Sequence, residues 1–165
     1  HMKRRPALTC LVALALAGCV PTPLFRDVPA EPSPSPRAVA ADIQAQMERS
    51  VLWGGMVIAL TEHAGYVEIE VLGFPTDPQA RPIPQARDGG RFIAIRAGRV
   101  DPNEVVPGRF LTLTGRITGE REMQLGEQRV LLPEVDTREI HLWPRDWNTR
   151  ERPRISVGIG VRGGL

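Results

Sequence analysis

The sequence predicts a mainly β protein: a small OB-like antiparallel β-barrel of about six strands with one short N-terminal helix. Short runs rich in Val, Ile and Leu recur between residues 51 and 143 and are separated by turn signals. The 165 residues include 16 glycines and 16 prolines, which suit strands joined by turns. Two runs contain internal glycines, as is typical where a barrel wall bends. A flat open sandwich, with glycines at edge bulges, is the competing architecture.

The N-terminal region has the pattern of a secretory signal. Three cations at positions 3–5 precede an apolar run over residues 7–17, which ends in Leu16-Ala17-Gly18-Cys19. The run is too short for a membrane span, which needs roughly 20 apolar residues. His1-Met2 is interpreted as a cloning scar, so residues 1–18 are expected to lie outside the fold.

Residues 16–19 resemble the lipobox of bacterial lipoprotein precursors. The resemblance implies cleavage before Cys19, a diacylglyceryl group on its sulfur and acylation of the new amino terminus. Two or more acyl chains hold a protein durably on a membrane, at about 0.8 kcal/mol per buried methylene. Val20 stands where an aspartate commonly retains such proteins in the inner membrane, so the outer membrane is favoured. The alternative is an ordinary cysteine after a cut at Ala17 or Gly18.

Cysteine usage and charge narrow the expectations further. Cys10 lies in the signal and Cys19 would carry lipid, so the folded region is expected to have no disulfide, although an oxidising envelope would permit one. No cofactor is expected. The formal net charge of +2 is small for a protein that binds a polyanion, and nucleic acid is not an expected partner.

Residues 19–36 are predicted to be the lipidated cysteine and a proline-rich tether. Six prolines between positions 21 and 36 exclude a helix and favour an extended polyproline conformation. At about 3.1 Å per residue, such a segment reaches on the order of 50 Å and would hold the domain clear of the headgroups. A structureless tail without a spacing role is the alternative.

The barrel domain is predicted over residues 37–147, with residues 148–165 as a C-terminal tail or last strand. Val39, Ile43 and Met47 recur at four-residue spacing, which predicts a short amphipathic helix over residues 37–50. Its apolar stripe is expected to pack against the sheet. A membrane-surface role is the alternative, although the helix lacks a cationic face.

The predicted strands are separated by short turns, apart from a long exposed loop over residues 74–90. They span residues 51–60, 66–73, 92–96, 109–119, 128–132 and 134–143, with the last two split by Pro133. Gly54-Gly55 predicts a bulge or sharp bend, and Gly115 a barrel corner. Alternation places Glu68 and Glu70 on a solvated face. Residues 155–161 form either a last strand or an ordered tail.

Several short motifs occur in a recognisable order along this region. They are VLWGGMVI (51–58), IEVLGFPTD (69–77), GRFIA (90–94), VDP (100–102), PGRFLTLTGRITG (107–119), LLPEV (131–135) and EIHLWP (139–144). Together with the lipobox, they make the chain resemble the Slp family of starvation-induced outer-membrane lipoproteins. The resemblance implies an envelope lipoprotein without established enzymatic activity, and it transfers no catalytic residue.

No residue pattern predicts a catalytic or metal site. His63 and His141 lack zinc-ligand spacing and are expected at half-buried or surface positions. The pairs Glu68 with Glu70, and Asp136 with Glu139, match glycosidase carboxylates by type, but the first pair lies on the face expected to be wet. Residues 158–163 match G-x-G-x-x-G by letter, without a following helix to bind phosphate.

A ligand platform is the remaining candidate, because small barrels often bind ligands through stacking aromatic side chains. The candidate residues are Trp53, Tyr66, Trp143, Arg145, Trp147 and Arg150. Their expected ligands are an envelope glycan, lipopolysaccharide phosphate or another envelope protein. The alternative is that the tryptophans fill the core and the arginines remain hydrated.

The sequence thus predicts a non-catalytic outer-membrane lipoprotein, anchored in the membrane through Cys19 and facing the periplasm. It would serve envelope maintenance or a stress response by binding. One alternative is a periplasmic hydrolase or metalloenzyme that acts on envelope polymers. The other is a homo-oligomeric coat in which residues 155–161 pair with a neighbouring chain.

Overall fold

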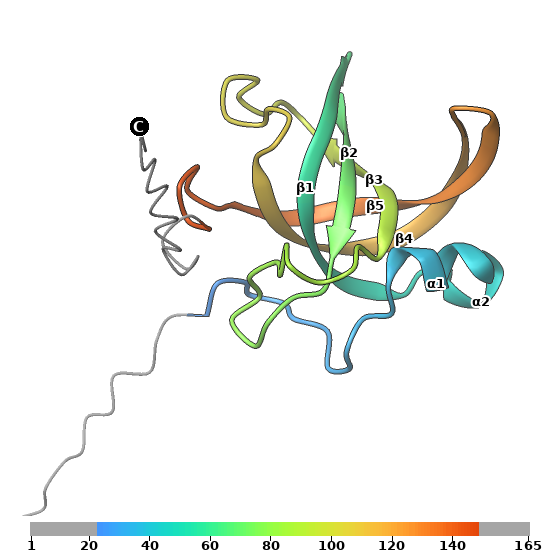
Figure 1. Cartoon of the computed structure of the whole chain (residues 1–165), viewed down its shortest axis with the longest axis horizontal. Coiled ribbons are helices and arrows are strands. Elements are labelled where there is room, and N and C mark those ends of the chain that lie inside the picture. The colour runs from blue at the N-terminus through green and yellow to red at the C-terminus, as the bar shows by residue number, and fades with distance from the viewer. Residues whose placement is uncertain (1–22, 149–165) are drawn as a thin grey trace, which may run out of the picture.

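The structure, a computed structural model, describes residues 23–148. The predicted signal, Cys19, Arg150 and residues 155–161 lie outside these residues. The elements are two short helices followed by five strands (Figure 1). In chain order they are α1 (Pro36–Ala41), α2 (Ile43–Gln46), β1 (Ser50–His63), β2 (Tyr66–Phe74), β3 (Gly90–Ala97), β4 (Phe110–Leu125) and β5 (Gln128–Leu142).

The strands close into a barrel in the order β1-β2-β3-β5-β4, with β4 returning to β1. This arrangement confirms the predicted mainly β, OB-like barrel. Two details differ from the prediction. β3 and β5 pair in parallel, through residues such as Ile93 with Glu134, whereas the other neighbours are antiparallel. The strands also number five among the described residues, because β5 runs through Pro133 without a break.

Pro133 does not interrupt β5 because it lies beside an irregularity in the ladder. The register between β4 and β5 shifts between Ile117 and Gly119, and Pro133 pairs with Glu120 next to that shift. A proline is tolerated at such bulges because its missing N–H donor is not needed there. The two predicted strands are therefore one long strand.

The glycines of β1 and β4 act in different ways. The β4–β5 register shifts between Thr114 and Gly115, which agrees with the corner predicted there. In β1 the shift lies between Val57 and Ala59, not at Gly54-Gly55. A Cβ at Gly55 would overlap the backbone of Leu72, so this glycine allows two strands to approach closely.

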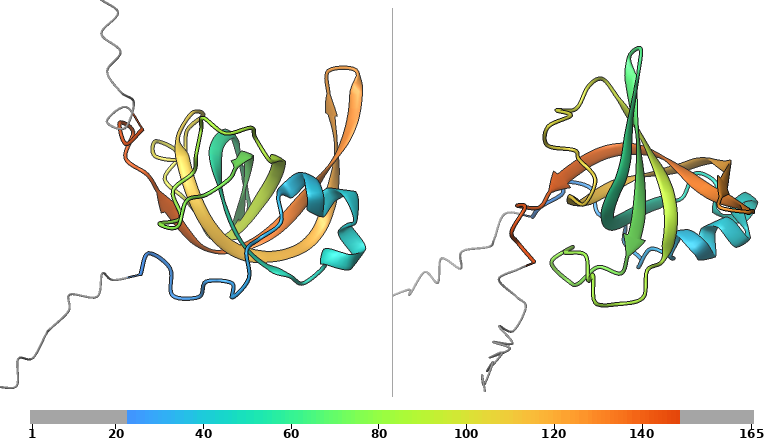
Figure 2. Two further views of the ribbon diagram at one scale, coloured as in Figure 1. Left: turned by 60° about the horizontal axis from the view of Figure 1, so that its bottom comes forward. Right: turned by 45° about the horizontal axis from the view of Figure 1, so that its top comes forward.

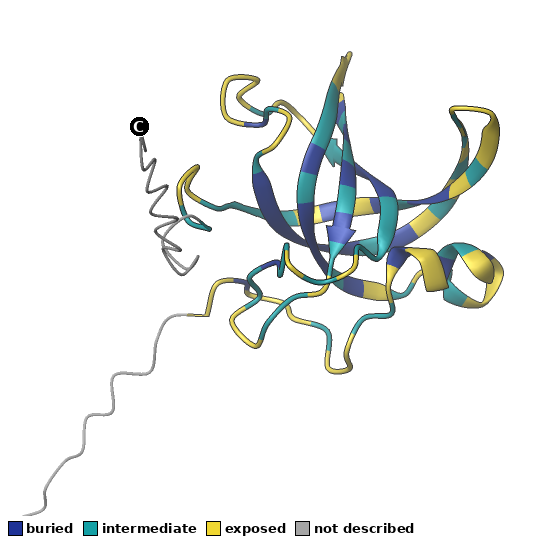
Figure 3. Cartoon of the chain, in the orientation of Figure 1, coloured by how far each residue is buried: buried dark blue, intermediate teal, exposed yellow. Residues whose placement is uncertain are grey.

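The core lies inside the barrel and beneath the helices (Figure 3). Alternate residues of β2 point inward, as predicted. The largest fully buried side chains include Phe92, Ile69, Leu111, Leu113 and Ile117. Val39 of α1 and Ile43 of α2 join this cluster, which confirms that the apolar stripe packs against the sheet.

The predicted single helix is broken in two at Asp42. Ser35 caps α1 by accepting a hydrogen bond from the backbone N of Ala38 at 3.1 Å, and Pro36 follows at the first turn. Asp42 has φ −148° and ψ 67°, outside the helical region, so it separates α1 from α2. The spacing of apolar residues predicted the buried face but not this break.

Residues 23–35, the N-terminal segment, pack along the barrel. Phe25 is only 3% exposed. The Ser33 hydroxyl accepts a hydrogen bond from the backbone N of Leu52 at 2.8 Å, and the Trp53 indole donates to the Pro34 carbonyl at 2.7 Å. Residues 23–35 of the predicted tether therefore contact the barrel, which the sequence analysis did not predict. Prolines exclude a helix, but they leave side chains and carbonyls free to bind the barrel.

Beyond the barrel, the strand pair β4–β5 continues as a projecting hairpin over residues 119–134, which we call the β4–β5 arm (Figure 1). The arm and helices α1 and α2 lie at one side of the barrel. The two ends of the described chain lie at the opposite side in all three views (Figures 1 and 2). The molecule thus has an arm side and a chain-end side.

Candidate functional site

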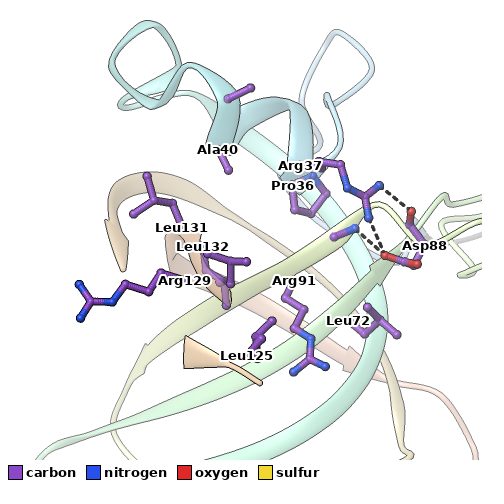
Figure 4. A pocket seen from close by; sticks show the side chains of 13 residues that line it. Pro36, Arg37, Ala40, Leu72, Asp88, Arg91, Leu125, Arg129, Leu131 and Leu132 are labelled. Atoms are coloured by element: carbon purple, nitrogen blue, oxygen red, sulfur yellow. Dashed lines mark hydrogen bonds and ion pairs between the residues drawn. The ribbon is translucent and has the colours of Figure 1, made fainter. Parts of the chain in front are cut away.

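A groove of about 700 Å³ opens between α1, the adjoining ends of β2 and β3, and the β4–β5 arm (Figure 4). Each wall comes from a different part of the chain. α1 contributes Pro36 and Ala40, β2 contributes Leu72, and the arm contributes the stretch from Arg129 to Leu132. The groove therefore exists only when the barrel closes and brings the arm next to α1.

The inner surface of the groove is largely apolar. Leu72, Leu125 and Leu132 line it, and Leu131 of the arm lies below Ala40 of α1 in Figure 4. Leu131 is 47% exposed. A large aliphatic side chain at the mouth of a concave surface is a common feature of ligand sites.

Three arginines stand around the groove. The Arg37 guanidinium donates to the Asp88 carboxylate at 3.0 Å, and Arg91 donates to Glu70 at 2.8 Å. Arg129 donates to Glu122 at 3.2 Å and is largely exposed. Each guanidinium has five N–H donors in a planar fork, so these contacts leave donors for an anionic ligand. The groove combines an apolar lining with a cationic edge.

A second set of charges links the arm to the barrel wall. Arg121 of the arm donates to Glu68 of β2 at 2.8 Å and lies 3.3 Å from the carboxylate of Glu134. The hydrogen bond from Arg121 is the main cause that lowers the pKa of Glu68, and the same contact raises the pKa of Arg121. His63 approaches Glu68 at 3.6 Å. Glu68 and Glu70 are thus half-buried and paired, rather than on an open wet face as predicted.

Two of the predicted platform residues meet on the chain-end side. The ring centroids of Trp143 and Trp147 are 5.6 Å apart, and Phe110 packs edge-on against Trp147 at 5.4 Å. The Trp143 indole donates to the Thr112 hydroxyl at 2.9 Å. Arg145 donates to the Asn103 carbonyl at 2.6 Å. Phe110, Arg145 and Trp147 border a small hollow of about 220 Å³.

The other predicted platform residues lie elsewhere. Trp53 is 4% exposed and packs in the core against Phe92, with 4.9 Å between ring centroids. Tyr66 stands at the start of β2 and stacks on His63 at 4.6 Å. Arg150 lies outside the described residues. The structure therefore does not assemble the six predicted residues into one platform.

The histidines occupy separate surroundings. His141 packs edge-on against Trp143 at 4.5 Å, and burial is the main cause that lowers its pKa, with a smaller contribution from Arg109. His63 is exposed near the turn between β1 and β2. No group of three or more His, Cys, Asp or Glu side chains suited to a metal ion occurs within residues 23–148.

Sequence reasoning missed the groove and the Glu68–Arg121 pair. The sequence predicts a strand end at Pro133, and a strand that ended there would leave the arm and its leucines without a partner. Continuous pairing through Pro133 is what carries residues 128–132 out to α1.

Within residues 23–148 there is no helix that combines the length and the hydropathy required to cross a membrane.

Two of the solved structures to which the chain is similar have low TM-scores. One is a small single-stranded DNA-binding protein from Streptomyces coelicolor, with 16% identity and a TM-score of 0.40, covering 58% of this chain and 94% of that one. The other is a putative aspartyl-tRNA synthetase from Leishmania major Friedlin, with 8% identity and a TM-score of 0.41, covering 74% and 23%. At these scores neither likeness supports an inference about ligands.

Comparison with curated sequences gives relatives of higher identity. An uncharacterized lipoprotein, YeaY, from Escherichia coli strain K12 is 31% identical over 118 residues, which cover 69% of this chain and 59% of the relative. An uncharacterized protein from Haemophilus influenzae is 28% identical over 96 residues, covering 58% and 52%. The chain thus spans a little over half the length of each. The family model described as "Outer membrane lipoprotein Slp family" matches residues 16–159, so the chain belongs to the Slp family of outer membrane lipoproteins.

Proposed function

We propose that this lipoprotein is anchored through acyl chains on Cys19, faces the periplasm and acts by binding rather than catalysis, in maintaining the envelope under stress. Its ligand is an anionic amphiphile: an envelope lipid that carries phosphate, such as lipopolysaccharide or an acidic phospholipid. The observation that carries this proposal is the groove on the arm side, which combines leucines with arginines.

The apolar part of the groove suits an acyl chain. Its volume of about 700 Å³ falls within the range of roughly 300–1,000 Å³ that is usual for small-molecule sites. Covering Leu131 and its neighbours would remove apolar surface from water, at about 25 cal/mol per Å². A ligand without an apolar part would leave that surface exposed.

The edge of the groove suits a phosphate group. The charged side chains that line it are three arginines and a single carboxylate, that of Asp88. Guanidinium groups bind phosphate through two parallel hydrogen bonds, which a sugar hydroxyl cannot match in strength. Since Asp88 already pairs with Arg37, the groove offers no free carboxylate pair of the kind that the hydrolase alternative needs.

The position of the groove also suits a ligand that enters from the periplasm. It lies on the arm side, whereas residue 23, which follows Cys19 closely in the sequence, lies on the chain-end side (Figures 1 and 2). An anchor on the chain-end side would leave the groove open to the periplasm. A ligand could then enter from outside the membrane that holds the protein.

The test measures lipid binding to the acylated protein in detergent micelles by native mass spectrometry. Lipid A and phosphatidylglycerol should bind, whereas an uncharged diacylglycerol should bind less. Leu131→Asp and Arg129→Ser should each weaken binding at least several-fold. Arg99→Ser, an exposed arginine in the β3–β4 connection, is the matched control and should bind as the parent does.

Unfolding midpoints would show whether the variants keep the fold. Leu131 and Arg129 are both exposed in the arm, so their midpoints should stay close to that of the parent. Equal binding by the parent, Leu131→Asp and Arg129→Ser would contradict the assignment of the groove. Binding of the uncharged lipid as strongly as lipid A would contradict the role of the arginines.

A further inference from the structure

The N-terminal segment displays apolar side chains on the surface. Within residues 23–148, four large apolar side chains are exposed: Leu24, Val28, Tyr66 and Leu131. Two of the four, Leu24 at 42% and Val28 at 57%, stand four residues apart in this short segment. Between them lie Arg26 and Asp27, whose side chains are also at the surface and carry opposite charges.

The segment holds these side chains in a fixed position. Phe25 is buried between the two exposed residues. The backbone N of Arg26 donates to the Glu139 carboxylate of β5 at 3.0 Å. Further along, the Ser33 hydroxyl binds the backbone of β1. Leu24 and Val28 are therefore exposed on a docked segment, while Phe25 between them is buried.

The sequence distance to the acylation site is short. Cys19 lies six residues before Phe25, and a fully extended chain covers at most about 3.6 Å per residue. Phe25 is thus within about 20 Å of an acylated Cys19. The anchor therefore keeps the face of the barrel that carries Phe25 close to the bilayer.

We propose that residues 24–28 form a membrane-contacting surface that docks the barrel on the bilayer of its own anchor. Leu24 and Val28 enter the boundary between headgroups and acyl chains, while Arg26 and Asp27, whose charges offset each other, stay among the hydrated headgroups. This inference rests on the acyl anchor at Cys19 that belongs to the proposed function. It adds a second contact to the anchor and thereby fixes the orientation of the barrel.

Two apolar side chains would bind a membrane weakly by themselves. The acyl anchor changes this, because it keeps the segment at a high local concentration beside the bilayer. Glu139 and His141 of β5, and Trp143 just beyond its end, lead from Arg26 to the Trp143–Trp147 pair. Tryptophans are favoured at membrane interfaces, so this pair suits the same side of the molecule.

The docked orientation directs the groove away from the membrane. The chain-end side carries the segment, and the arm side carries the groove (Figures 1 and 2). With the chain-end side on the bilayer, the β4–β5 arm points into the periplasm. The two contacts with lipid are thus at opposite sides: a surface contact beside the anchor and a groove remote from it.

The experiment uses single-cysteine variants of the full, acylated protein in vesicles of phosphatidylethanolamine and phosphatidylglycerol. Processed protein has no thiol other than acylated Cys19, so an added cysteine carries the only fluorescent probe. Val28→Cys is compared with Ala64→Cys in the turn between β1 and β2. A nitroxide on the lipid headgroups should quench the probe at position 28 and leave the probe at position 64 bright. Equal intensity changes at the two positions would overturn the proposal.

A second variant separates docking from folding. The probe is placed at Asp27→Cys, with and without the double substitution L24S/V28S. Because both side chains are exposed, the unfolding midpoint should not change, while quenching at position 27 should be largely lost. Unchanged quenching would overturn the role of these two residues.

Intact mass distinguishes the two proposals. Acylated Cys19 together with an unquenched probe at position 28 would refute membrane docking alone. An unmodified Cys19 would refute the anchor, and docking with it. Lipid binding in the groove is measured separately in micelles through Leu131→Asp, so its failure would leave the docking result intact.

Discussion

Strands β4 and β5 serve two different purposes along their length. Over residues 110–117, seven of eight β4 residues are buried and form the wall of the barrel. Over residues 119–125, in the β4–β5 arm, none is buried and exposure alternates with partial burial. One continuous pair of strands thus provides the core in its first half and one wall of a groove in its second.

The difference comes from what covers the two faces of the sheet. In the barrel half, the inner face packs on the core, and other parts of the chain cover the outer face. The Thr112 hydroxyl, for example, donates to the Ala80 carbonyl at 2.6 Å and accepts from the Trp143 indole. In the arm, Arg121 pairs with Glu68 of β2, and the leucines line the groove. Stability should therefore depend on the barrel half and binding on the arm.

Two glycines of β4 provide the strongest test of this contrast. A Cβ at Gly115 would overlap the carbonyl oxygen of Asp136 and a methyl group of Val135, both in β5. The strand pairing would have to open, so Gly115→Ala should lower the free energy of unfolding by about 4 kcal/mol or more, a large part of the stability of a small domain. Chemical denaturation followed by circular dichroism measures this loss.

The matched control is Gly119→Ala, four residues further along the same strand. The nearest atom to a Cβ at this position is Glu134 Oε1 at 3.9 Å, an ordinary contact. The change in unfolding free energy should stay within about 1 kcal/mol. Similar losses at positions 115 and 119 would show that the arm is packed as rigidly as the barrel, against our comparison.

Leucines extend the same test to the side chains. Leu113 is fully buried in the barrel core, whereas Leu131 is half-exposed in the arm. Leu113→Ala should cost about 3 kcal/mol of unfolding free energy, through lost burial and the cavity left behind. Leu131→Ala should cost less than about 1 kcal/mol. The unfolding free energies and lipid A binding of both variants are measured together.

For lipid A binding, the same two variants should rank in the opposite order. Leu131→Ala should weaken lipid A binding, because it removes apolar surface from the groove. Leu113→Ala, measured well below its unfolding transition, should bind as the parent does. Weaker binding by the Leu113 variant than by the Leu131 variant would mean that binding depends on the barrel core.

Local sequence patterns were sufficient to predict the strands of the barrel half and their inward faces. The alternation of Val67, Ile69 and Val71 predicted the inward face of β2, and all three side chains are buried. Gly115 was expected at a corner and lies at a register shift. The motifs around the barrel strands also supported the family assignment, which the family match confirms.

Local patterns failed where distant segments determine the structure. Prolines between positions 21 and 36 indicated an extended chain, but not that Phe25 would be buried against the barrel. Pro133 favoured a strand end because its tolerance depends on an irregularity in the neighbouring strand. The groove could not be predicted either, since Leu72 and Leu131 meet only through closure of the barrel.

The Glu68–Arg121 pair connects the two halves, and its loss should cost less stability than Gly115→Ala or Leu113→Ala. It joins β2 of the barrel to the arm, and the Arg121 hydrogen bond holds the pKa of Glu68 below its ordinary value of 4.5. Since the folded state favours the carboxylate, the pair stabilises the protein above pH 4.5, and this stability is lost as the pH falls through the lowered pKa. Its protonation should loosen the arm before the barrel unfolds.

Glu68→Gln should therefore lower the unfolding free energy at pH 7 by about 1–2 kcal/mol, the usual contribution of a hydrogen bond to a charged group. The difference from the parent should shrink as the pH is lowered below 4.5, because the parent then loses the same carboxylate. Denaturation at a series of pH values measures both effects. Glu122→Gln, whose partner Arg129 is largely exposed, is the control and should change stability by less than about 0.5 kcal/mol at any pH. A difference at Glu68 that stayed constant down to pH 3 would show that the charge of this carboxylate does not hold the arm against β2.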